Sequence, residues 1–155
     1  LLFLTLFNTG KIKYAPGTFA SLITCLLFLF FINFFTFLTL LFFTLIIFIY
    51  SFVAINSSYE TFQENDPQEI VIDEVVGQML PLLTIPVYET LCPSPKEYYC
   101  VAAFIFFRLF DIWKPFPINY VENNTSGALG IMLDDVIAGL YTIITLTIIF
   151  FFLGA

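Results

Sequence analysis

The sequence predicts an all-α, polytopic helical bundle embedded in a membrane. Hydrophobic residues make up 60% of the 155 residues, and aromatic residues make up 20%. Only 11% of the residues are charged, too few to cover the outside of a soluble domain of this length. The mean hydropathy is +0.98, and long stretches of the chain carry almost no charge. We expect a single domain over residues 1–155.

The first long apolar run covers residues 19–55. One helix needs about 20 residues to cross the hydrocarbon core of a bilayer, so this run is too long for a single untilted helix. We therefore expect a tight hairpin of two helices that turns near residues 33–36, with a short first arm.

The middle of the chain predicts broken or re-entrant helices. An acidic connection at residues 56–69 precedes an apolar segment that contains Pro81 and Pro86. Each proline removes a backbone donor, so we expect a helix that starts near Pro67 and is kinked or broken further on. A turn at residues 92–97 and a short apolar segment at 98–110 follow.

The end of the chain predicts a polar loop at residues 111–127 and a last span at 136–153. Asp134 and Asp135 would then stand at the start of this helix, where the helix dipole favours anions. Gly127 and Gly130 would allow unusual dihedral angles or close approach, and Ala138 and Gly139 would permit close helix packing.

Counting the crossings brings four polar stretches to one membrane face. Lys11 and Lys13 place the start of the chain in the cytoplasm by the positive-inside tendency. Residues 8–18, 66–74, 108–118 and 127–135 then all reach the cytoplasmic face, whether residues 75–110 span the membrane or re-enter it. This arrangement predicts an active site at the cytoplasmic membrane face.

The composition excludes several kinds of chemistry. The net charge of −7 argues against a nucleic-acid partner, and the chain has no histidine. A phosphohistidine, a Ser-His-Asp triad and a His-ligated zinc are therefore impossible. The nearest Cys–Arg pair, Cys100 and Arg108, encloses an apolar run instead of a phosphate-binding loop. Carboxylates, lysine, arginine, hydroxyls or a bound metal must perform any reaction.

Five acidic residues are the candidate catalytic groups. Asp73 and Glu74 lie within VIDEVV, where keeping charge among apolar residues is expensive. The acids at 134 and 135 could form a doubly acidic helix cap, although one would suffice. Asp111 could belong to a local ion-pair ladder with Arg108 and Lys114. The full candidate set is Asp73, Glu74, Asp111, Asp134 and Asp135.

A carboxylate cluster of this kind suits Mg²⁺, a hard cation that prefers oxygen ligands. We expect Asp73, Glu74, Asp134 and Asp135 to hold one or two ions. Substrate phosphate would be contacted by the basic residues Arg108 and Lys114 and, in the loop before the first apolar helix, by Lys11 and Thr18. The residues therefore indicate metal-assisted phosphoryl chemistry on a lipid headgroup, with direct attack by water favoured over a covalent intermediate.

Four segments resemble the signature blocks of the bacterial phosphatidylglycerophosphatase A family, in the same order. They read APGTFASL, IVIDEVVGQ, FRLFDIWKPFPI and GIMLDDVIAG. The resemblance implies an all-helical, Mg²⁺-dependent phosphatase of the bacterial inner membrane. It would hydrolyse phosphatidylglycerophosphate to phosphatidylglycerol and inorganic phosphate in glycerophospholipid biosynthesis. The five acids named above match motif positions, and Arg108 and Lys114 fall in the third block.

Other functions remain open at this stage. A small ion transporter or proton-coupled transporter also keeps acids within membrane segments, although this chain is short and shows no inverted repeat. A non-catalytic membrane scaffold is the second alternative. A headgroup transferase would need a DGxxAR motif, which is absent.

Overall fold

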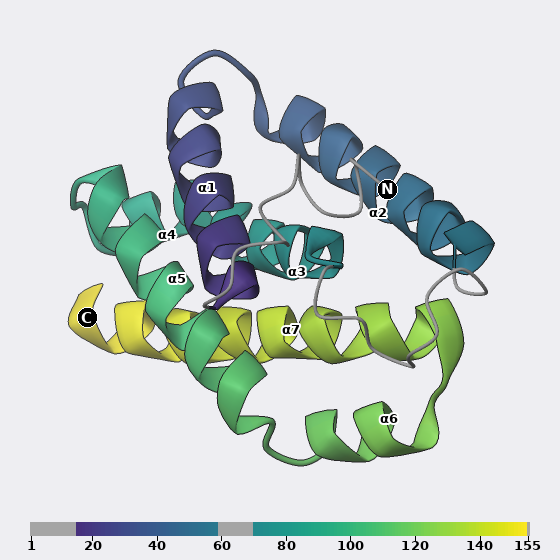
Figure 1. Ribbon diagram of the computed structural model, residues 1–155. Coiled ribbons are helices and arrows are strands. Elements are labelled where there is room, and N and C mark those ends of the chain that lie inside the picture. The colour runs from purple at the N-terminus through teal and green to yellow at the C-terminus, as the bar shows by residue number, and fades with distance from the viewer. Residues whose placement is uncertain (1–14, 59–69, 155) are drawn as a thin grey trace.

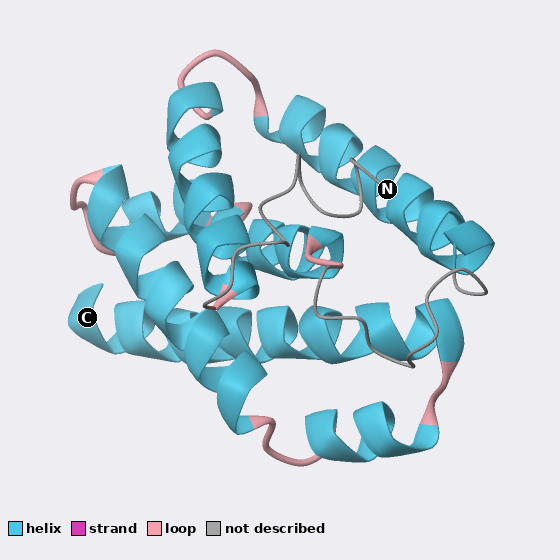
Figure 2. Ribbon diagram, in the orientation of Figure 1, coloured by secondary structure: helices cyan, strands magenta, loops and turns pink. Residues whose placement is uncertain are grey.

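The computed structural model of the chain describes residues 15–58 and 70–154. Within these ranges it contains seven α-helices and no strand, which confirms the all-α prediction (Figures 1 and 2). The helices are α1 (Pro16–Phe31), α2 (Phe37–Ser58), α3 (Ile72–Leu82), α4 (Ile85–Leu91), α5 (Lys96–Trp113), α6 (Ile118–Asn124) and α7 (Gly127–Gly154).

The helices α1 and α2 form the expected hairpin. Pro16 begins α1, a position where its missing N–H leaves no hydrogen bond unmade. The turn occupies residues 32–36, and the Thr36 and Thr39 hydroxyls share a hydrogen bond of 2.9 Å at the start of α2. The predicted turn and the short first arm are both confirmed, since α1 has 16 residues and α2 has 22.

The prolines of the middle segment break the helix as expected. Pro81 lies in the last turn of α3, and Pro86 lies in the first turn of α4. The predicted start of this helix near Pro67 lies outside the described residues. In the described part, Ile70 and Val71 are not helical, and α3 begins at Ile72. Both β-branched residues are buried in the core.

Two predictions for the end of the chain are wrong. Residues 111–127 are not a continuous loop, because α5 runs to Trp113 and α6 forms a short helix after it. The long helix begins at Gly127, not beside Asp134. Gly127 has a φ of 76°, a left-handed conformation that glycine adopts readily, and from there the chain turns directly into α7. Asp134 and Asp135 therefore lie about two turns inside the helix.

The short helix α3 lies at the centre of the bundle. It packs against α1, α2, α5 and α7 (Figure 1). Its buried side chains include Ile72, Val75 and Val76, which join a core with Ala20 of α1 and Met132 of α7. Because α3 is covered by neighbours, the acids in its first turn are held inside the bundle.

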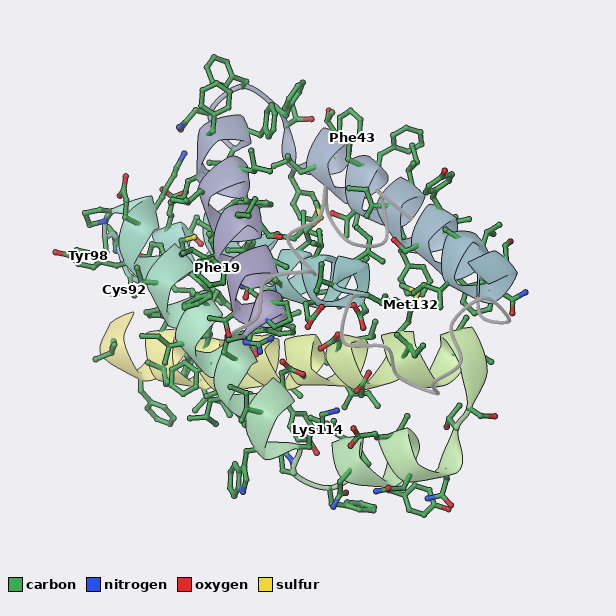
Figure 3. The ribbon with its side chains drawn as sticks, viewed as in Figure 1. Phe19, Phe43, Cys92, Tyr98, Lys114 and Met132 are labelled. Atoms are coloured by element: carbon green, nitrogen blue, oxygen red, sulfur yellow. The ribbon has the colours of Figure 1, made fainter. Side chains whose placement is uncertain are left out.

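The outside of the bundle is apolar, as a membrane protein requires. Phe34 is 69% exposed, Leu38 72% and Phe152 74%, and aromatic side chains project from α1 and α2 (Figure 3). Among the described residues, Phe37–Ser57 and Gly127–Leu153 are long and apolar enough to cross a bilayer, and Pro16–Phe31 is a shorter apolar helix. The number of crossings made by residues 75–110 stays a prediction.

Candidate active site

A pocket of about 340 Å³ lies where four separate segments of the chain meet. Its walls come from the start of α1, the start of α3, the end of α5 and the first turns of α7, so the predicted convergence of polar stretches is confirmed for their described parts. The lining residues are 15–17, Ile70, Asp73, Glu74, Arg108, Asp111, Lys114, Ile131, Asp134 and Asp135. All five candidate catalytic acids therefore reach one pocket.

Three of these acids form a compact cluster. Oxygen atoms of Asp73, Glu74 and Asp135 all lie within 4.8 Å of one another. The Asp73 residue is 7% exposed and Asp135 is 3% exposed. Such a separation allows one small cation to contact all three carboxylates, so these residues form the candidate metal centre.

Glycines bring the two helices that carry this cluster close together. A Cβ atom added to Gly77 of α3 would lie 2.7 Å from the backbone oxygen of Asp135 and 2.8 Å from the Phe107 ring. A Cβ on Gly139 of α7 would lie 2.6 Å from the backbone oxygen of Gly77. No larger residue fits this crossing without movement, and the expected close packing at Gly139 is confirmed.

The start of α1 covers the cluster from another side. A Cβ on Gly17 would overlap the Glu74 carboxylate and lie 3.2 Å from Arg108 Nη1. Ala15, just before α1, has a φ of 49°, a left-handed conformation that is uncommon for a residue other than glycine. The structure therefore holds a strained backbone directly at the pocket.

The acid cluster carries more negative charge than its described surroundings neutralise. Among the described residues, Asp73 Oδ1, Glu74 Oε2 and Asp135 Oδ1 are buried and have no hydrogen-bond partner. Burial raises the pKa of Asp73 well above its ordinary value, and the charge of Glu74 raises it further. Burial also raises the pKa of Glu74 to about 7. Unpaired buried carboxylates are unfavourable, so the residues present fit a bound cation.

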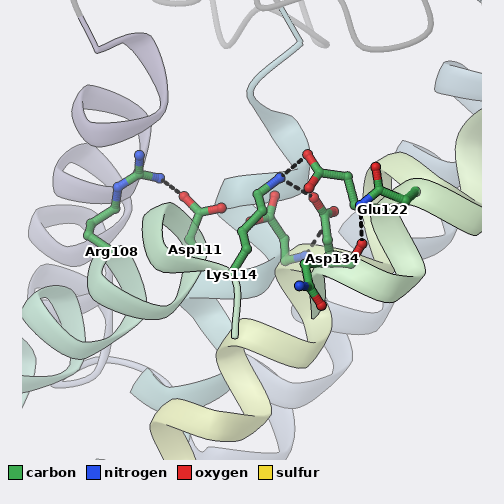
Figure 4. Close-up of polar contacts among 8 residues, drawn as sticks. Arg108, Asp111, Lys114, Glu122 and Asp134 are labelled. Carbon is green, nitrogen blue, oxygen red and sulfur yellow. Dashed lines mark hydrogen bonds and ion pairs between the residues drawn. The ribbon is translucent and has the colours of Figure 1, made fainter. Parts of the chain in front are cut away.

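Two basic residues also line the pocket, and each is paired with an acid (Figure 4). Arg108 Nη1 lies 2.5 Å from Asp111 Oδ2, an i, i+3 pair on α5. Lys114 Nζ lies 2.5 Å from Glu122 Oε1 and 3.0 Å from Asp134 Oδ2. Burial alone would lower the pKa of Lys114, but the two acids raise it above its ordinary value. Lys114 therefore stays charged, and both basic side chains line the pocket, where they can meet phosphate oxygens.

The structure separates Asp134 from the other predicted metal ligands. Its Oδ2 accepts a hydrogen bond from Lys114, and its Oδ1 accepts one of 3.0 Å from the backbone N–H of Asp135. Asp134 is absent from the compact cluster of Asp73, Glu74 and Asp135. Its catalytic role, like its metal role, stays a prediction.

Two predicted phosphate contacts are not part of the described pocket. Lys11 lies outside the described residues. Thr18 lies in the first turn of α1, where its backbone N–H donates to the Ala15 carbonyl at 3.1 Å, but it does not line the pocket. Glu122 was not anticipated, because its contact with Lys114 depends on how α6 folds back beside α7. No motif or periodicity in the sequence indicates that pairing.

Comparison with known proteins shows the family of this chain. The sequence profile described as Phosphatidylglycerophosphatase A matches residues 2–150. The chain belongs to this family. A Haemophilus influenzae phosphatidylglycerophosphatase A is 35% identical over 89% of this chain and 80% of its own length. The Escherichia coli phosphatidylglycerophosphatase A is 29% identical over 86% of this chain and 73% of its own length.

A relative with another assigned substrate is also similar. A Bacteroides thetaiotaomicron protein, provisionally named a phosphatidylinositol-3-phosphatase, is 33% identical over 92% of this chain and 87% of its own length. No solved structure is significantly similar to the chain. Membership of the phosphatidylglycerophosphatase A family thus rests on sequence, and the pocket shows where its four signature blocks meet.

Proposed function

We propose that this protein hydrolyses the terminal phosphate of phosphatidylglycerophosphate, giving phosphatidylglycerol and inorganic phosphate for phospholipid synthesis. The family membership supports a phosphatase that acts on a phosphate monoester. The observation that supports this proposal most strongly is that the clustered carboxylates Asp73, Glu74 and Asp135 meet Arg108 and Lys114 in one pocket. That arrangement favours a phosphatase over the transporter that was the alternative.

The cation that fits the cluster best is Mg²⁺. Asp73, Glu74 and Asp135 offer only hard oxygen ligands, and their unpaired buried oxygens leave room for a positive charge. When bound, the ion would supply charge neutralisation for the phosphate oxygens and would make a bound water more acidic. The three carboxylates would hold it, and the apolar shell of Ile70 and Ile131 would limit access of other water.

In the proposed reaction, side chains of the pocket bind the phosphate and accept a proton. Arg108 and Lys114 hold the phosphate oxygens; Arg108 Nε is buried with no partner in the described part of the chain. A water oxygen attacks phosphorus and loses a proton to a pocket carboxylate, while the bond from phosphorus to the headgroup oxygen breaks. The released headgroup oxygen takes up a proton, so a free hydroxyl and inorganic phosphate result.

We place the pocket at the cytoplasmic face of the bacterial inner membrane. Arg108 and Lys114 line the pocket, and Lys11 and Lys13 precede its residues 15–17 by a few positions. The remaining basic residue, Lys96, lies at the other end of α5 and donates to Asn33 in the hairpin turn at 3.1 Å. Basic residues prefer the cytoplasmic side, so this distribution supports the proposed orientation.

Phosphatidylinositol 3-phosphate is the second candidate substrate, because the Bacteroides relative carries that name. The test is phosphate release by purified protein from either lipid in mixed micelles with Mg²⁺. We expect faster release from phosphatidylglycerophosphate. Faster release from the phosphoinositide would reassign the substrate, and no release from either lipid would refute the proposed phosphatase.

A further inference from the structure

A second pocket lies directly beside the first, between the end of α6 and the first turns of α7. It has a volume of about 260 Å³, and residues 122–127 form most of its wall, together with Gly130. Ile131 and Asp134 line both pockets. The two spaces therefore share a wall, and one ligand could occupy both.

The two pockets differ in charge. Among the described residues, the second pocket is lined by the acids Glu122 and Asp134 and by no lysine or arginine. Lys114 contacts both of those acids, but it lines only the first pocket (Figure 4). Arg108 and Lys114 both line the first pocket, so a phosphate that meets two basic side chains belongs there.

The uncharged lining of the second pocket is rich in hydrogen-bonding groups. Asn123 and Asn124 each use an amide N–H to bond the helix carbonyl four residues earlier, at 2.6 and 2.7 Å. Their amide oxygens, the hydroxyls of Thr125 and Ser126, and the two carboxylates are all acceptors. A hydroxyl group on the ligand matches such a lining.

The pocket is shaped by a tight contact. A Cβ atom on Gly130 would overlap the backbone carbonyl of Thr125, so α7 and the segment after α6 pack without intervening side-chain volume. Lys114 makes a second connection between the two helices, because its ammonium group contacts both Glu122 of α6 and Asp134 of α7. The wall shared by the two pockets is thus fixed from both sides.

We propose that the second pocket binds the hydroxyl-bearing part of a polyol headgroup, while the phosphate attached to that polyol lies in the first pocket. This inference rests on the proposed function, and it adds a site that would separate polyol phosphates from simpler phosphate monoesters. The polyol would contact Thr125 and Ser126, and its phosphate ester oxygen would pass the wall formed by Ile131 and Asp134.

The test measures inhibition of phosphatidylglycerophosphate hydrolysis by two small probes, sn-glycerol 3-phosphate and inorganic phosphate. The first carries a polyol and the second does not. In a Thr125→Val/Ser126→Ala variant, removing the two side-chain hydroxyls should raise Ki for glycerol phosphate by roughly tenfold, and KM for the lipid should rise with it. Ki for inorganic phosphate should stay unchanged. Ser126→Phe, which fills the pocket from an exposed position, should act in the same way.

Asn119→Ala is the matched control, because Asn119 is exposed on α6 and lines neither pocket. It should leave all three constants at their wild-type values. The inference is overturned if both pocket variants leave Ki for glycerol phosphate unchanged, or if both inhibitor constants rise equally. Wild-type protein that releases no phosphate would instead refute the proposed function, so the two failures are distinguishable.

Discussion

Gly139 of α7 faces the backbone carbonyl of Gly77 of α3, and a Cβ atom on Gly139 would lie 2.6 Å from that oxygen. This contact sets the distance between the helices that carry Asp135 and the Asp73–Glu74 pair. The acid cluster therefore depends on two residues that have no side chains and take no part in the chemistry.

Replacing Gly139 by alanine should force α3 and α7 apart. We expect a loss of stability of about 1–3 kcal/mol, the usual range for overpacking, and a larger loss of activity because the three carboxylates separate. Thermal unfolding in detergent and phosphate release measure the two effects. Leu140→Ala is the control, since Leu140 is 47% exposed on the same helix. Equal activity in Gly139→Ala and wild type would show that the close contact is dispensable.

Lys114 should bind a phosphate oxygen of the substrate while it also pairs with the carboxylates of Glu122 and Asp134. Lys114→Gln removes its charge from the pocket and leaves Asp134 without its partner. We expect kcat/KM to fall by about 10- to 100-fold, the range for losing a hydrogen bond to a charged group. Lys96→Gln provides a matched control at the other end of α5 and should retain full activity. If Lys114→Gln is as active as that control, the lysine does not contact the phosphate.

Stability without metal should fall as the pH rises. The pKa of Glu74 is about 7 in the folded protein, above its ordinary value of 4.5, because burial disfavours the carboxylate. A raised pKa stabilises the fold below pH 4.5, and this contribution is lost as the pH rises through 7. Adding Mg²⁺ should neutralise the ionised acids, so its effect on Tm should be larger at pH 8 than at pH 5.

The measurement is thermal unfolding in detergent at both pH values, with EDTA or with Mg²⁺. Glu74→Gln carries no titrating carboxyl at this position, so it should flatten the pH dependence in EDTA. A Mg²⁺ effect on Tm that is equal at the two pH values would mean that the buried acids do not bind the ion.

The chemistry of the site was predictable from local sequence, but its geometry was only partly so. VIDEVV places two acids among apolar residues, and such charges survive only where something compensates them. The absence of histidine excluded a phosphohistidine, a Ser-His-Asp triad and a His-ligated zinc. Neither observation distinguishes Asp134 from Asp135. Asp134 pairs with Lys114 and Asp135 joins the acid cluster, and this difference depends on how α7 is rotated.

The helix ends were the least predictable part of the fold. Pro67 favours a helix start but lies outside the described residues, and α3 begins only at Ile72, after the buried and non-helical Ile70 and Val71. The sequence did not predict α6, because its segment has mixed polarity. Glu122 contacts Lys114 only because that helix folds back beside α7. Tertiary packing decides each of these features, so local signals could not supply them.

The central claim is that Asp73, Glu74 and Asp135 hold the cation required for hydrolysis. The most direct measurement is a Mg²⁺ titration of phosphate release from phosphatidylglycerophosphate by wild type and Asp135→Asn, with Glu97→Gln, an exposed acid at the start of α5, as control. Wild type and Glu97→Gln should be inactive in EDTA and regain full activity with Mg²⁺, while Asp135→Asn should lose at least about 100-fold at every concentration. Full activity in EDTA, or equal titrations for wild type and Asp135→Asn, would contradict the claim.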